Sequence, residues 1–319
     1  MPRIRLAARS ISLTVLAATP LCAAFAPWHA AVAQDGAAKL TLDRAAGRTL
    51  KYAVALSVRL EQASGGAAAE KTEIGCEADL VLAFGATSPV GDTEVKITID
   101  ALRAVRNDAQ GVLSVTLPKV TMEADPTEGR PAAMLAVQRA IKASTITLTI
   151  DPEGKITGVD GLSAAEEEVG KRGELDRTAL GIFDTDYLRE TLAPLFTADG
   201  ASKGPRRAGD GWQSEETIGL GPAGGVRTTT DWSVVEVSPS AVRYEGKPSL
   251  AVLRPAAPDE MTPSLEIAEQ SASVQAEWSR EAKALASRAA RQSARTVWTL
   301  GDEKMEQKQT ISSTIAIKK

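Results

Sequence analysis

The sequence predicts a mostly β protein of the α+β class, in which a long curved antiparallel sheet or half-barrel is covered by short helices. Three observations support this fold class. Apolar and polar residues alternate through most of the chain, as expected for strands with one buried face. Around residues 162–198 the apolar residues change to helical spacing. The alternation then returns and continues to the end. A flatter two-sheet β-sandwich is the alternative architecture.

The first 33 residues have the features of a secretory signal peptide in the required order. Three arginines precede an apolar stretch, which ends in a small-x-small cleavage pattern at residues 31–33. Prolines and small residues make this stretch a weak transmembrane anchor. We therefore expect export to the periplasm or the medium, with no stable transmembrane span after cleavage. Residues 34–319 then form a single β-rich domain with the helical insert around 162–198.

The individual elements follow from local patterns. In Leu50–Leu60, every second residue is apolar, which predicts a strand with one buried face. Asp151–Gly154 is a β-turn signal between two short strands. Pro131–Lys142 and the spacing of apolar residues over Leu188–Phe196 predict helices. Further strand patterns lie at 74–84, 95–99, 113–117, 146–150, 155–159, 226–234, 242–252 and 311–317.

Residues 265–300 carry conflicting signals. Ala282–Arg295 is rich in Ala, Lys and Arg, which favours a helix by propensity. Val274, Ala276 and Trp278 alternate instead, and the region ends in a β-favouring Val-Trp-Thr segment. We interpret the region as two strands joined around residues 280–283.

The available side chains exclude most catalytic chemistry. The single histidine, His29, lies in the expected leader, so the mature chain lacks imidazole for general-base catalysis or zinc binding. Cys76 falls on an apolar strand face, where a thiol is expected to be buried and unreactive. The leader holds three of the 37 basic residues and none of the 41 acidic ones, so the mature net charge is −7. We expect no catalytic residue, metal, cofactor or nucleic-acid partner.

Acidic residues leave one enzymatic alternative open. Glycosidase chemistry needs only two carboxyl groups that converge in a cleft. However, Glu166–Glu168 fits a solvated helix face, and Asp184 and Asp186 fit a helix N-terminus. The glycine-rich segment 219–225 lacks the Lys-Ser or Lys-Thr of a phosphate-binding loop. A carboxylate-only hydrolase is therefore the least favoured hypothesis.

Two short motifs carry a resemblance. Asp151–Ile156 reads Asp-Pro-Glu-Gly-Lys-Ile, and Gly209–Trp212 reads Gly-Asp-Gly-Trp after the helical insert. In this order the elements resemble a family of uncharacterised exported bacterial proteins with a Gly-Asp-x-Trp strand motif. Their overall shape resembles the LolA-like lipoprotein-carrier fold, a half-open barrel with a helical lid. This resemblance implies a shape and assigns no active residue.

The leading functional hypothesis is a non-enzymatic envelope protein that binds a lipid, a lipoprotein acyl chain or another hydrophobic ligand inside the half-barrel. Leu56, Leu82 and Ile97 are the candidate ligand-binding residues, because their positions place them on the inner apolar face. Packing against the helices explains the same pattern equally well. The alternative function is a structural or protein-interaction module of the envelope, bound to another envelope protein and to no small ligand.

Overall fold

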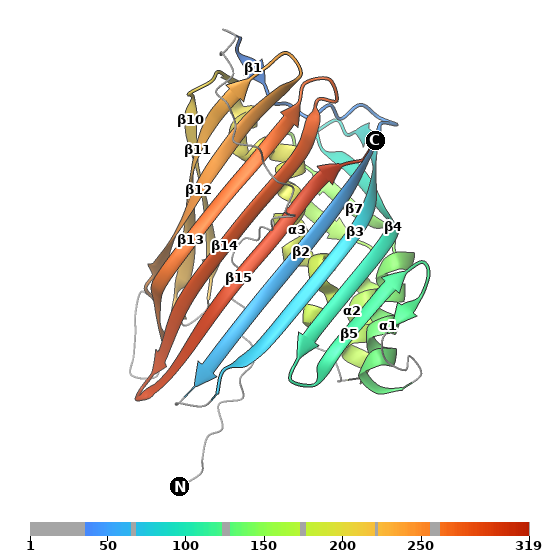
Figure 1. Cartoon of the computed structure of the whole chain (residues 1–319). Helices are drawn as coiled ribbons and strands as arrows, with labels where there is room; N and C mark the ends of the chain where they lie inside the picture. Colours follow the sequence, from blue (N-terminus) through green and yellow to red (C-terminus); the bar gives the residue numbers. More distant parts are fainter. Residues whose placement is uncertain are drawn as a thin grey trace.

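The computed structural model describes residues 36–64, 68–122, 128–172, 177–220, 223–255 and 262–318. The expected leader, residues 1–33, lies outside the described residues. The predicted mostly β architecture is confirmed: the described chain forms a large curved antiparallel sheet with helices on one side (Figure 1).

The strands are β1 Ala38–Lys39, β2 Thr49–Ser64, β3 Glu70–Thr87, β4 Thr93–Asp108, β5 Gly111–Leu117, β6 Thr121–Met122, β7 Ile146–Ile150, β8 Ile156–Asp160, β9 Pro205–Arg206, β10 Gly211–Gly219, β11 Gly225–Val237, β12 Ala241–Leu253, β13 Ser264–Ser279, β14 Ala284–Leu300 and β15 Glu303–Ile317. The helices are α1 Gly129–Ala143, α2 Ser163–Arg172 and α3 Thr185–Thr197, with 3-10 helices η1 Arg177–Phe183 and η2 Ala198–Lys203.

The main sheet is open. Its strand order is β10-β11-β12-β13-β14-β15-β2-β3-β4-β5-β6, and β7 and β8 continue from the first half of β4. Every neighbouring pair is antiparallel. Strand β15, last in the sequence, pairs with β2 and so joins the two halves of the chain. The end strands β10 and β6 do not pair with each other among the described residues.

Strand parity divides the sheet into an inner and an outer face. On β2, Tyr52, Val54 and Leu56 are buried, whereas the intervening Ala53 and Ala55 keep some exposed surface. The buried set faces the helices, and we call this side the inner face. Because the residue period of a strand is two, the same division runs across all the long strands.

The helices cover part of the inner face. Helix α1 buries Met134, Val137 and Ile141, and it packs against β4 and β5. At its start, the Arg130 guanidinium lies 2.6 Å from the Asp108 carboxylate at the end of β4. Burial opposes ionisation of Asp108, but hydrogen bonds from Arg130 and Arg106 outweigh it and lower its pKa.

The ambiguous region is a pair of long strands, as the alternation predicts. Strands β13 and β14 meet at residues 280–283, where Lys283 has a positive φ of 42°. Every residue of Ser287–Leu300 on β14 pairs with β15, and most of β14 also pairs with β13. Ladders on both sides of β14 outweigh the modest helix propensity of alanine, lysine and arginine.

The sheet has a local split between β12 and β13. Pairing between these strands ends at Gly246 and Val274, although both strands continue beyond that point. Pro248 lies two residues later and has no N–H to donate. The Gln270 side chain replaces a ladder rung: its Oε1 accepts from the Leu250 N–H at 2.6 Å, and its Nε2 donates to the Leu250 carbonyl at 3.1 Å.

We expect Leu82→Ala to lower the free energy of unfolding by about 3 kcal/mol, because Leu82 is 1% exposed and its loss leaves a cavity. Val81→Ala is the matched control on the outer face of the same strand, and we expect it to cost less than about 1 kcal/mol. Urea unfolding followed by circular dichroism measures both. Equal losses for the two variants would contradict the assignment of the inner face.

Candidate functional site

The predicted ligand-binding residues lie in the hydrophobic core. Leu56, Leu82 and Ile97 are 3%, 1% and 0% exposed, and Leu82 and Ile97 are direct cross-strand partners. The covering helices lie close to this part of the sheet: η1 packs on β2 and β3, and α1 packs on β4. Gly181 of η1 is so close that an added Cβ would lie 3.0 Å from the Cys76 Cβ. A ligand-binding role for the three residues stays a prediction.

Cys76 is buried in the same core, as its strand position predicts. Burial raises the pKa of its thiol to about 12, although a hydrogen bond from the Ile182 backbone acts in the opposite direction. At neutral pH the side chain is therefore a thiol and packs as a small apolar group.

A buried ion pair joins the helical cover to the sheet. Asp199 of η2 accepts from Arg288 Nε of β14, at 3.2 Å to Oδ1 and 3.3 Å to Oδ2. The two side chains are only 6% and 5% exposed. Tyr244 of β12 donates its hydroxyl to Asp199 Oδ2 at 3.3 Å, and burial, followed by the charge of Asp199, raises the pKa of Tyr244. Three elements therefore depend on one carboxylate.

An aromatic cluster lies beside this ion pair. The rings of Trp212 and Trp232 are stacked with their centroids 5.8 Å apart, and Tyr244 is tilted against both. Arg206 lies over the Trp212 ring at 4.7 Å, and the Trp212 indole donates to the Asp199 carbonyl at 2.9 Å. The Gly-Asp-Gly-Trp motif thus ends in a residue that holds η2 against the sheet.

The backbone of η2 is strained where it supplies Asp199. Ala198, Asp199 and Gly200 have successive positive φ values of 47°, 53° and 86°. Such conformations are costly for residues with a Cβ and persist where the surroundings hold them. Gly200 faces the Trp212 indole, so the ion pair and the aromatic cluster together fix this turn.

We expect Asp199→Asn to lower the free energy of unfolding by about 3 kcal/mol, because it leaves the Arg288 guanidinium buried without a counter-charge. Glu77→Gln, which breaks the exposed pair with Arg103, is the control and should cost less than about 1 kcal/mol. Chemical denaturation at constant salt measures both. A loss for Asp199→Asn as small as that of the control would show that the buried pair does not anchor η2.

Glu190 of α3 and Glu216 of β10 are carboxyl groups with raised pKa values. Desolvation, followed by the negative charge of Glu216, raises the pKa of Glu190 on α3 to about 8. Desolvation also raises the pKa of Glu216, which lies opposite Thr228 on the inner face and keeps an exposed surface. Acid–base pairs in glycosidases have pKa values that are driven apart. Here both move upward, so the pair fits that chemistry poorly.

Glu190→Gln tests this environment through pH. The folded-state pKa of Glu190 is raised, so the folded chain binds the proton more tightly than the unfolded chain, and stability falls as pH rises from about 4.5 to about 8. The variant should gain on the order of 2 kcal/mol over the natural chain at pH 8.5 and little at pH 4. Thermal melts across this range measure the difference, with Glu167→Gln as an exposed control on α2. A pH-independent difference would contradict the raised pKa.

The inner face of β14 and β15 changes from apolar to mixed polarity away from the ion pair. We call these residues the inner strip, and their positions on adjacent strands place Ala294 opposite Gln309 and Thr296 opposite Gln307. The strip consists of Gln292, Ala294, Thr296, Trp298, Gln307 and Gln309, all of which are buried. Among the described elements, α3 contacts β14, whereas β15 has no comparable contact with a helix. In Figure 1 the lower ends of β14 and β15 extend beyond the helices.

Three buried polar atoms of the inner strip lack a hydrogen-bond partner within the described chain: both amide atoms of Gln292 and Nε1 of Trp298. Gln292 is 4% exposed and Trp298 is 6% exposed. Burying such groups unpaired costs about 1–3 kcal/mol each, and nearly all buried polar atoms in folded proteins are satisfied. The inner strip therefore offers hydrogen-bonding capacity that the described residues do not use.

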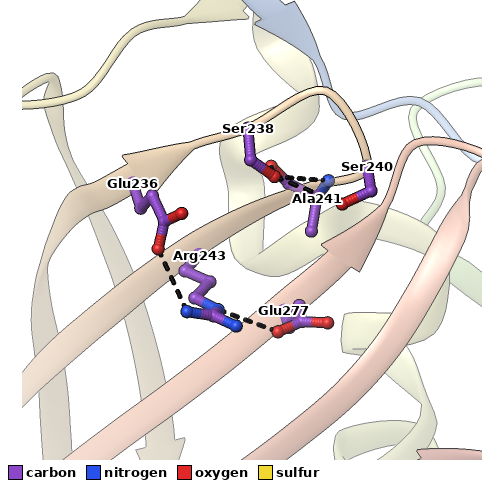
Figure 2. Close-up of polar contacts among 6 residues, drawn as sticks. All are labelled: Glu236, Ser238, Ser240, Ala241, Arg243 and Glu277. Carbon is purple, nitrogen blue, oxygen red and sulfur yellow. Dashed lines mark hydrogen bonds and ion pairs between the residues drawn. The ribbon is translucent and has the colours of Figure 1, made fainter. Parts of the chain in front are cut away.

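A separate groove of about 950 Å³ crosses the outer face. Small side chains such as Ala53, Ala289 and Thr314 contribute to its lining. Arg243 also belongs to its lining. Figure 2 shows the Arg243 guanidinium between the carboxylates of Glu236 and Glu277, which lie 3.0 and 2.9 Å away. Neither the predicted residues nor the unpaired atoms line this groove, so the inner strip is the better candidate site.

Sequence reasoning missed Asp199, Arg288 and Gln292. The alternation of β14 contains a signal for two of them, because Arg288 and Gln292 share the parity of the buried Ala290 and Ala294. A charged and an amide residue at inward positions indicate either a buried partner or a site. Asp199 comes after the segment with helical spacing, and no pattern in the sequence marks it as buried or paired.

The described residues contain no cluster of three side chains suited to hold a metal ion. Within the same residues, no helix is both long and apolar enough to span a bilayer. No protein-family model matches the chain, and no curated protein matches it.

Several solved structures are distantly similar. A lipovitellin structure concerned with lipid–protein interactions covers 85% of this chain at 9% identity and a TM-score of 0.40, and this chain spans 25% of the lipovitellin chain. The match to DynF from the dynemicin biosynthesis pathway of Micromonospora chersina covers 93% of this chain and 95% of the DynF chain, at 8% identity and a TM-score of 0.20. The match to OccK5 (OpdH) of Pseudomonas aeruginosa covers 85% of this chain and 98% of the OccK5 chain, at 8% identity and a TM-score of 0.22. At these TM-scores the likeness carries no functional argument.

Proposed function

We propose that this chain is an exported, non-enzymatic protein that holds a small amphipathic molecule against the inner face of its curved sheet, in the periplasm or outside the cell. The observation that carries the proposal is the inner strip, where buried polar atoms without partners lie among buried apolar surface. The shape resemblance to lipoprotein carriers and the expected leader agree with it.

The two parts of the inner face suit different tasks. Around Leu56, Leu82 and Ile97 the helices pack close to the sheet, which favours a role for this part in stability. Beyond the helices, Leu250, Leu265 and Trp298 provide apolar contact beside the glutamines of the inner strip. Apolar burial contributes roughly 25 cal/mol per Å² to binding, and the polar groups then select orientation.

Mass spectrometry of an organic extract tests the proposal. The chain is expressed with its own leader and purified from the exported fraction without detergent. Bound small molecules are then extracted from it with organic solvent. We expect an amphiphile at about one molecule per chain, and native mass spectrometry should show uptake of 1-monolauroylglycerol by extracted protein. A chain that arrives empty and takes up neither monolauroylglycerol nor laurate would overturn the proposal. If a stoichiometric protein partner then accompanies it, the structural or interaction module becomes the better function.

A further inference from the structure

We propose that the inner strip recognises a neutral polar group that both donates and accepts hydrogen bonds, such as a hydroxyl or an amide, and that Gln292 is the residue that binds it. This inference rests on the proposed function and specifies its ligand class. It starts from the unused hydrogen-bonding capacity of one buried side chain.

Gln292 sets the donor and acceptor requirement. Its Nε2 needs an acceptor and its Oε1 needs a donor, and the described chain supplies neither. A carboxylate only accepts, so it could pair with Nε2 and would leave Oε1 unsatisfied. A hydroxyl or a primary amide can satisfy both atoms. Trp298 Nε1, about 20 Å further along β14, offers one more donor to an acceptor.

The surrounding charges also disfavour an anion. Arg288 is the only Lys or Arg at an inward position of β13, β14, β15 or β2 among the described residues. It lies two inward positions from Gln292, and Asp199 already neutralises it. Glu216 adds an acid on the inner face of β10. A buried carboxylate headgroup would therefore lack a counter-charge at Gln292.

The remaining partners of Gln292 indicate a ligand with an apolar part. Its cross-strand neighbours on the inner face are Ile311 of β15 and Ala272 of β13. Ile311 lies in turn opposite Val58 of β2. The amide thus emerges from an apolar and small-residue surface, on which a chain attached to the neutral headgroup can pack.

Three probes with a common acyl length test the inference: 1-monolauroylglycerol, lauramide and laurate, titrated at pH 7.5 into the extracted mature chain. We expect both neutral probes to bind at least tenfold more tightly than laurate. Gln292→Leu should weaken the neutral probes at least tenfold and weaken laurate binding by a much smaller factor, because laurate can use only Nε2. Gln275→Leu makes the same change at an exposed outer position and should leave all three affinities unchanged.

Thermal melts of the unliganded variants separate recognition from a structural role. Replacing an unpaired buried amide with leucine of similar size should leave the melting temperature of Gln292→Leu equal to or above that of the natural chain. A large fall would reveal a structural partner and overturn the inference.

The binding outcomes are also distinct. Equal affinities for all three probes, with no effect of Gln292→Leu, would overturn the headgroup assignment and leave the proposed function standing. Failure of every probe to bind a chain that is also purified without any amphiphile would overturn the proposed function itself, whereas an anionic amphiphile in the extract would overturn the headgroup assignment alone. Binding of only one neutral probe would identify whether a hydroxyl or an amide is the natural headgroup, which supports the inference.

Discussion

The carboxylate of Asp199 meets the guanidinium of Arg288 in a region from which water is almost excluded, and the position of the helical cover depends on this contact. The sheet needs a cover, because the inner faces of its strands are apolar over much of their area. Apolar packing alone is non-directional and would tolerate sliding of the helices. A buried charge tolerates no such shift, since separation from its partner leaves it unsolvated. The ion pair therefore fixes the position of the helices along the sheet, whereas the hydrophobic effect stabilises the contact between them.

The strain in η2 follows from the same constraint. The chain leaves α3 through three residues with positive φ, and this turn aims Asp199 at β14 and its carbonyl at Trp212. Trp212 belongs to the Gly-Asp-Gly-Trp motif, and the other motif also reaches this end of α3. There an added Cβ on Gly154 would lie 2.6 Å from the Phe196 carbonyl oxygen. Both motifs thus make contacts where the helices meet the sheet, which explains why they flank the helical insert in the sequence.

The covered and uncovered parts of the inner face differ in composition as well as in packing. Where η1 and α1 approach the sheet, the inward strand residues are mostly aliphatic or aromatic. Gln138 of α1 is a polar exception there: its Nε2 donates to the Ala179 carbonyl, and its Oε1 has no partner among the described residues. On β14 and β15 beyond the ion pair, glutamine and threonine take inward positions beside alanine and tryptophan. A core built only for stability gains nothing from a buried unpaired amide. Departures from local rules concentrate at functional sites, and three of the four buried unpaired side-chain atoms of the described residues lie in the inner strip.

The sequence alone indicated most of the long strands, their two faces, the central helices and the burial of Cys76, because each depends on residue spacing within a few neighbours. It gave no sign of the two-residue strands β1 and β9 or of the second half of β4. It also indicated strands across residues 265–300, where alternation and helix propensity disagreed, and the ladders on both sides of β14 decided the outcome. The tertiary structure alone decided which inward residues meet. Asp199 and Arg288 are 89 residues apart, and Gln292 has the same parity as its apolar neighbours, so no local pattern separates a core position from a site. That distinction depends on what lies across the fold from each side chain, and only the packing of helices on the sheet establishes it.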